Sequence, residues 1–279
     1  MNKLSLERKA KVIKVLCEGN SIRATARITD TAINTVVKLL REIGTACLEY
    51  QDKVMRDLPL KKLQCDEIWS FVYSKEKNIP EDKQGQFGYG DVWTFTAIDA
   101  DTKLVPSWLV GMRNLECAAA FIDDLKVRLA NRVQLTTDGH KMYLEAVEHA
   151  FGADVDYGML VKLYGQDLEG EKRYSPAKCI GSEKHVIQGN PDKKAISTSY
   201  VERQNLTMRM SMRRFTRLTN AFSKKLENHE YALALYFMHY NFVKLHKTLA
   251  NPYPRTPAMA SGLTNHIWTV EEIVKLRGG

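Results

Sequence analysis

The order of apolar segments between residues 63 and 163 constrains the fold more than any other feature of this sequence. Leu63–Ser74 is rich in Ile, Trp, Phe, Val and Tyr, which is typical of a buried strand. Val92–Ile98 and Leu104–Val110 have the same character, and the intervening residues 99–101 predict a hairpin turn. We therefore expect three consecutive antiparallel strands at the start of this region.

Helices and strands then alternate along the chain. Residues 115–130 carry apolar side chains at helical spacing, and Val133–Thr137 is a short apolar run typical of a strand. A second helix is expected after Asp138-Gly139, and Tyr157–Leu163 predicts a fifth strand. This order is that of the ribonuclease-H-like (retroviral-integrase-type) α/β fold. Other α/β folds contain similar runs, so element order alone leaves the fold class open.

The first 45 residues predict three helices. Ser5 and Ser21 can each cap a helix, Gly19 separates the first two, and Thr29-Asp30 is expected to supply the next turn and cap. The third helix begins near Ile33 and can continue towards residue 54. This is a helix-turn-helix pattern, whose last helix enters the DNA major groove, although a helical cap that only packs on the main domain is an alternative. The exposed positions able to touch DNA are Asn34, Thr35, Lys38 and Arg41.

Charge and cysteine usage narrow the class of protein. The formal net charge is +8, which favours a nucleic-acid partner because phosphate contacts reward Lys and Arg. The five cysteines show no C-x-x-C spacing, which argues against both a zinc ribbon and a disulfide framework. No signal segment or membrane-spanning run is visible. We expect a cytoplasmic, nucleoid-associated prokaryotic protein without a membrane partner.

Three acids stand where a metal site could form. Asp66 lies within the first predicted strand, Asp138 ends the fourth, and Glu202 falls in a helix predicted over Ser197–Arg217. Their hard oxygen ligands suit two Mg²⁺ or Mn²⁺ ions, which at about 3.5–4 Å apart promote in-line phosphoryl displacement. Glu67 competes with Asp66 for this role, and each acid could instead be an ordinary turn or surface residue.

A basic segment follows Glu202. Seven Lys/Arg and no acid occur from residue 203 to residue 225. In a continuous helix, Arg209, Arg213 and Arg217 would form a stripe near Glu202, which predicts a phosphate track; a solvated charged face is the alternative. The basic residues of this segment are Arg203, Arg209, Arg213, Arg214, Arg217, Lys224 and Lys225.

Short motifs around the three acids resemble the acidic blocks of the insertion-sequence-one (IS-one) family of DDE transposases. The motifs are C-D-E-I-W at residues 65–69, T-D-G at 137–139 and V-E-R-Q-N-L at 201–206. The similarity covers roughly residues 60–275, although the N-terminal cysteines of some members are missing here. The resemblance implies a transposase that cuts at terminal inverted repeats and joins the 3′ ends to target DNA. It also implies that Asp66, rather than Glu67, acts with Asp138 and Glu202.

The predicted organisation has four parts. Residues 1–45 form the helix-turn-helix, 46–60 a helical linker, 61–220 the catalytic domain with an insertion loop at about 165–195, and 221–279 a C-terminal helical segment and tail. The expected partner is double-stranded DNA, comprising transposon ends and target, bound by a homodimer or higher oligomer. A ribonuclease-H-like nuclease without strand transfer and a domesticated DNA-binding protein remain alternatives.

Overall fold

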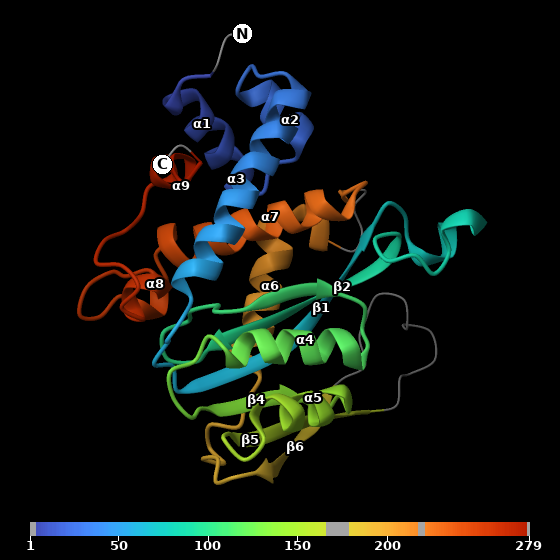
Figure 1. Cartoon of the computed structure of the whole chain (residues 1–279), viewed down its shortest axis with the longest axis vertical. Coiled ribbons are helices and arrows are strands. Elements are labelled where there is room, and N and C mark those ends of the chain that lie inside the picture. The colour runs from blue at the N-terminus through green and yellow to red at the C-terminus, as the bar shows by residue number, and fades with distance from the viewer. Residues whose placement is uncertain (1–3, 166–178, 217–220, 278–279) are drawn as a thin grey trace.

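The computed structural model describes residues 4–165, 179–216 and 221–277 (Figure 1). Its N-terminal part contains the three predicted helices: α1 (Leu6–Cys17), α2 (Ile22–Ile28) and α3 (Ile33–Val54). The Ser5 and Ser21 hydroxyls accept hydrogen bonds from the backbone amides of Arg8 and Ala24, so both predicted caps are confirmed. The predicted cap at Thr29-Asp30 is wrong, because α3 starts after Ala32 without a side-chain cap.

A six-stranded mixed sheet forms the centre of this mixed α/β structure. The strands lie in the order β3-β2-β1-β4-β5-β6. β4 and β5 run parallel to β1, whereas β2, β3 and β6 each run antiparallel to the strand that precedes them in the chain. The strand bounds are β1 (Lys62–Val72), β2 (Gly90–Asp99), β3 (Trp108–Gly111), β4 (Gln134–Asp138), β5 (Asp156–Tyr164) and β6 (Cys179–Gln188). The five predicted strands are therefore present, with β3 shorter than expected.

Helices cover both faces of the sheet. On one face lie α4 (Leu115–Lys126) and α5 (Met142–Phe151), which pack against each other (Figure 1). On the other face α6 (Ser199–Ser211) contacts β1 and β2. Alternate residues of β1 consequently face different helices, which decides the environments of neighbouring acids.

The sixth strand was not predicted. β6 lies inside the segment for which the sequence predicts an insertion loop at 165–195, and it pairs with β5 at the edge of the sheet. Almost every residue of β6 is exposed, so the strand has no alternation of apolar and polar side chains that a sequence pattern could reveal. The remainder of the predicted loop from 166 to 178 lies outside the described residues.

The helix predicted over Ser197–Arg217 is shorter than expected. α6 begins after Thr198 and ends at Ser211, because Met212 is extended (φ −128°, ψ 108°) and a 3-10 turn follows over Arg213–Phe215. This turn buries Met212 and Phe215 in the core. The predicted arginine stripe along one continuous helix is therefore wrong, and Arg217 itself lies outside the described residues.

The C-terminal region packs on the N-terminal helices. α7 (Leu226–Met238) crosses α3 and continues into a π-helical turn over His239–Val243. The short helices α8 (Pro257–Ala260) and α9 (Val270–Lys275) follow, and α9 packs against α1. Single 3-10 turns occur at Glu76–Asn78, Glu81–Lys83 and Lys247–Leu249. In the described part of the chain, no helix is both long and apolar enough to cross a bilayer.

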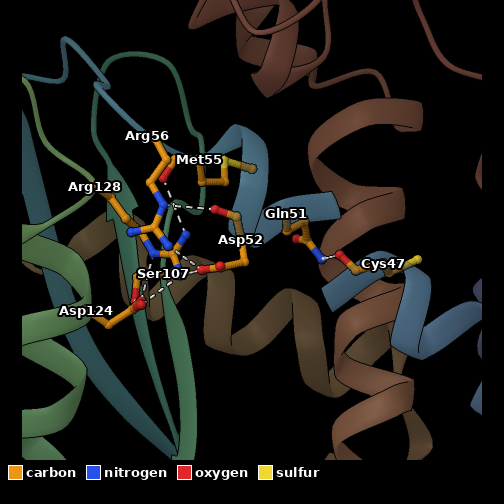
Figure 2. A network of polar contacts seen from close by, with 8 residues as sticks. All are labelled: Cys47, Gln51, Asp52, Met55, Arg56, Ser107, Asp124 and Arg128. Carbon is orange, nitrogen blue, oxygen red and sulfur yellow. Dashed lines mark hydrogen bonds and ion pairs between the residues drawn. The ribbon is translucent and has the colours of Figure 1, made fainter. Parts of the chain in front are cut away.

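A buried arginine fastens the end of α3 to the sheet domain (Figure 2). The Arg128 guanidinium donates to Asp124 at 2.7 and 2.8 Å, to Asp52 at 3.0 Å and to the Met55 carbonyl at 3.3 Å. Ser107, just before β3, also donates to Asp124 at 2.6 Å. Arg128 thus connects α3 to α4, with two carboxylates satisfying its charge, and Asp124 extends the network to the residue before β3.

α3 and α7 approach each other closely at Gly44. A Cβ atom added there would lie 2.5 Å from the Tyr231 Cβ and 2.8 Å from its Cα. We expect Gly44→Ala to lower the free energy of unfolding by about 1–3 kcal/mol, since overpacking outweighs the better helix propensity of alanine. Urea unfolding measures the effect, with exposed Glu49→Ala in the same helix as the control. A Gly44→Ala protein as stable as the parent would show that α3 and α7 can move apart enough to admit a methyl group without a measurable loss of stability.

Candidate functional site

Strand register brings two of the predicted acids together. β1 and β4 are parallel, and Cys65 pairs with Thr137, so the next residues along each strand are Asp66 and Asp138. One carboxylate oxygen from each of Asp66, Glu67 and Asp138 lies within 4.8 Å of the other two. Asp138 is the last residue of β4, and its Oδ1 accepts a hydrogen bond from the His140 backbone amide at 3.0 Å. The carboxylates therefore meet where β4 turns towards α5.

Asp66 is fixed by two hydrogen bonds. Its Oδ1 accepts from the Glu67 backbone amide and its Oδ2 from the Asn205 side-chain amide on α6, both at 2.8 Å. The pKa of Asp66 is raised to about 7, first by burial and then by the negative charges of Glu67 and Asp138, with a smaller contribution from Glu202. A protein that keeps this carboxylate ionised near neutral pH needs a nearby positive charge.

Glu67 belongs to the same group of oxygens but has different partners. Its side chain is 1% exposed, and Oε1 accepts from Arg113 Nε at 2.7 Å and Nη2 at 2.6 Å. Oε2 accepts from the Tyr143 hydroxyl of α5 at 2.9 Å. Both oxygens of Glu67 are thus engaged by protein groups, whereas Asp66 has no cationic side chain within ion-pair distance among the described residues. This difference favours Asp66 over Glu67 as a ligand.

Glu202 lies in the first turn of α6, outside the 4.8 Å group. Its Oε1 accepts a hydrogen bond from the Thr198 hydroxyl, and its Oε2 lies 2.5 Å from the Lys162 ammonium. Lys162 projects from β5, two residues after Leu160, which pairs with Asp138. Glu202 is close enough to Asp66 to raise its pKa, so Lys162 and the three acids share one electrostatic neighbourhood.

Two residues of this neighbourhood were missed from the sequence. Asn205 is part of the E-R-Q-N block, but only the packing of α6 on β1 reveals that it donates to Asp66. Lys162 is a single lysine in a strand, and its role follows from the pairing of β5 with β4. Finding these two residues required the packing of α6 on β1 and the pairing of β1, β4 and β5, which the sequence alone does not give.

The donor set fits a hard divalent cation. Carboxylate oxygens are the preferred ligands of Mg²⁺ and Mn²⁺, and a bound cation would offset the repulsion that raises the pKa of Asp66. Two buried oxygens near Asp66, Asn205 Oδ1 and Thr96 Oγ1, have no hydrogen-bond partner among the described residues. Thr96 pairs directly with Asp66 across β1 and β2. Unsatisfied acceptors at this position suit a hydrated ion.

The predicted DNA-contacting residues are spread over two surfaces. At the start of α3, Asn34, Lys38 and Arg41 are exposed, Thr35 is half-buried, and Lys38 lies 3.9 Å from Glu42. On and after α6 the exposed cations are Arg203, Arg213, Lys224 and Lys225, while Arg209 and Arg214 are half-buried. Both surfaces offer positive charge, but the second is divided by the end of α6.

Comparison with known proteins gives little further information. No protein-family model matches the chain, and no curated protein matches it in sequence. Among solved structures, a chain from a pre-cleavage Mos1 transpososome is similar at 10% sequence identity and a TM-score of 0.22. The match covers 56% of this chain and spans 60% of that chain's length. Similarity at this level does not place the protein in a family.

The raised pKa of Asp66 predicts a specific pH dependence of stability. The pKa is about 7 in the folded protein against an ordinary value of 3.8, so the folded state binds more protons between these values. In EDTA, stability should therefore fall as pH rises from about 4 to about 7 and then level off. Saturating Mg²⁺ should raise the melting temperature more at pH 8 than at pH 5. Thermal melts of the parent and Asp66→Asn test this, and identical pH profiles for the two proteins would contradict it.

Proposed function

We propose that this protein is a metal-dependent DNA transposase of the DDE class. The observation that carries the proposal is the adjacency of Asp66 and Asp138 on parallel strands, with α6 presenting Asn205 to Asp66 and Glu202 nearby. A strand order in which β1 lies between β2 and β4, with β4 and β5 parallel to it, supports a ribonuclease-H-like catalytic domain. The E-R-Q-N and D-E-I-W motifs support membership of the IS-one family.

In this proposal Asp66, Asp138 and Glu202 hold two Mg²⁺ or Mn²⁺ ions. When bound, such ions supply an activated water or 3′-hydroxyl and stabilisation of the leaving oxygen. Asn205 fixes the orientation of Asp66, and the Glu67–Arg113–Tyr143 contacts fix the strand behind it. Lys162 holds Glu202 from the adjacent strand. These residues hold the carboxylates in the positions that phosphoryl displacement requires.

The proposal assigns the remaining parts of the chain to DNA. The helix-turn-helix at 1–45 reads the transposon ends, and the cations on and after α6 contact phosphates near the reacting strand. The helical linker at 46–60, the catalytic domain at 61–220 and the segment at 221–279 keep the order given above. The active species is a homodimer or higher oligomer on DNA in the prokaryotic cytoplasm, associated with the nucleoid.

Strand transfer from a pre-cut end tests the proposal. The parent protein is incubated with labelled duplexes that carry the inverted repeats flanking its own coding region, a supercoiled target plasmid and Mg²⁺. A transposase is expected to nick uncut ends and to join pre-cut 3′ ends to the plasmid. Nicking without joining would identify a nuclease, and binding with neither reaction would identify a DNA-binding protein without chemistry.

A further inference from the structure

A cavity of about 500 Å³ lies between the N-terminal helices and the end of α6. One wall is formed by the end of α1, the following turn and the start of α2, and another by Ser211–Arg214. Phe222 and the middle of α7 close the cavity. The two main walls touch at Gly19, where an added Cβ would lie 2.5 Å from the Ser211 carbonyl oxygen. The cavity is thus part of the junction between the predicted DNA-binding helices and the candidate site.

The charged side chains among the described residues that line this cavity are all positive. Among the described lining residues are Arg23, Arg213 and Arg214, and none is Asp or Glu. Arg214 Nε donates to the Ser223 hydroxyl at 2.9 Å, and no carboxylate in the described part of the chain forms an ion pair with its guanidinium. Burial lowers the pKa of Arg214 to about 10. A half-buried cation without a counter-charge is costly, and an anion in the cavity would offset that cost.

The rest of the lining is apolar and aromatic. Phe222 and Tyr236 both border the cavity, together with Met212 and Leu235. The Phe222 ring packs on Phe71 at 5.0 Å, and the Tyr236 hydroxyl accepts from Gln204 at 3.1 Å, so both rings are held in place from outside the cavity. Fixed aromatic side chains beside arginines suit a ligand that combines a planar ring with a phosphate. The volume lies in the range of sites for small organic ligands.

α6 connects this cavity to the candidate metal site. Glu202 lies in its first turn, and Ser211, its last residue, lines the cavity. Nine residues of helix correspond to about 14 Å, or about four base steps of 3.4 Å along a DNA strand. The distance along α6 between the acids and the cavity thus corresponds to a few nucleotides of a DNA strand. A base that is still paired within the duplex cannot enter the cavity, whereas an unpaired one can.

We propose that the cavity binds one unpaired nucleotide of the DNA strand, with its phosphate at Arg214 and its base against Phe222 and Tyr236. The proposal rests on the proposed function only in taking DNA as the substrate. Stacking on aromatic side chains contributes about 1–3 kcal/mol per base, enough to offset the few kcal/mol that unpairing costs. The cavity would then favour DNA ends that are frayed or carry an overhang.

Fluorescence anisotropy in EDTA, where no cleavage can occur, tests this. The parent protein is titrated with a labelled blunt duplex and with the same duplex carrying a three-nucleotide overhang on either strand. We expect the better overhang to bind about tenfold more tightly than the blunt end. The same overhang built from abasic nucleotides should lose this advantage. Equal binding of the blunt and overhanging duplexes, or equal binding of the normal and abasic overhangs, would overturn the proposal.

Variants locate the effect in the cavity. Phe222→Ala should remove the preference for the overhang and leave the affinity for blunt duplex within about twofold. Arg214→Gln should remove the same preference and also weaken binding of the blunt duplex, because it removes a cation. Exposed Lys225→Gln, which removes a cation outside the cavity lining, should weaken both duplexes equally. The abasic comparison uses only the parent, so a variant that fails to fold does not weaken the test. Cleavage of transposon ends without an overhang preference would refute nucleotide binding in the cavity but not the transposase proposal. An overhang preference without Mg²⁺-dependent cleavage would refute the transposase proposal but not nucleotide binding in the cavity.

Discussion

Replacement of Asp138 by asparagine is expected to lower Mg²⁺-dependent nicking of transposon ends by about a thousandfold or more. The asparagine keeps the size of the side chain and the acceptor for the His140 amide, but removes one of the carboxylates that lie within 4.8 Å of one another. Loss of a negative metal ligand removes stabilisation from the charge that develops during displacement, and a thousandfold loss corresponds to about 4 kcal/mol. Denaturing gel electrophoresis of labelled ends measures the rate.

The same substitution should not destabilise the protein in the absence of metal. The Asp138 charge helps to raise the pKa of Asp66, so its removal relieves repulsion and should leave the melting temperature in EDTA unchanged or higher. Asp101→Asn, at an exposed turn and outside the group of carboxylates around Asp66, is the matched control and should nick like the parent. If Asp138→Asn cuts as fast as the parent, these acids are not the reaction centre.

The sequence was most informative where a local pattern determines the structure. The serine caps of α1 and α2 and the apolar runs of β1, β2, β4 and β5 depend on near neighbours, and the structure contains all of them. β6 lacked a pattern because it is exposed on both faces. The end of α6 depends on tertiary packing, since Met212 and Phe215 leave the helical path to reach the core.

The candidate site shows the same division. The acids could be nominated from their places within a strand, at a strand end and in a helix, and the family resemblance implied Asp66 rather than Glu67. The physical difference between these two acids appears only in the structure, on the opposite faces of β1. Glu67 meets Arg113 and Tyr143 on one side, while Asp66 meets Asn205 of α6 on the other. Lys162 became part of the site only through the pairing of β5 with β4, which joins residues far apart in the chain. A local sequence pattern does not show which residues of distant strands pair with each other.

Replacement of Lys162 by glutamine is expected to change metal binding and cleavage in opposite directions. The Lys162 ammonium lies 2.5 Å from Glu202 Oε2. A metal ion held by Glu202, as proposed, competes with this ion pair for the carboxylate. Without the lysine charge, Mn²⁺ should bind up to about tenfold more tightly, which corresponds to about 1.4 kcal/mol. Isothermal titration calorimetry with Mn²⁺ in the absence of DNA measures this affinity.

Cleavage should nevertheless fall by about a hundredfold at saturating metal. Lys162 lies on the strand that pairs with β4 beside Asp138. In the proposed reaction its ammonium contacts the DNA phosphate once Glu202 binds metal, and loss of one such electrostatic contact typically costs about 10²–10³ in rate. Lys162→Arg keeps the charge and should retain most of the activity. Exposed Lys77→Gln removes the same charge far along the chain and should alter neither quantity. If Lys162→Gln weakens both metal binding and cleavage, the lysine supports the fold of the site and does not compete for Glu202, because a competitor's removal can only strengthen metal binding.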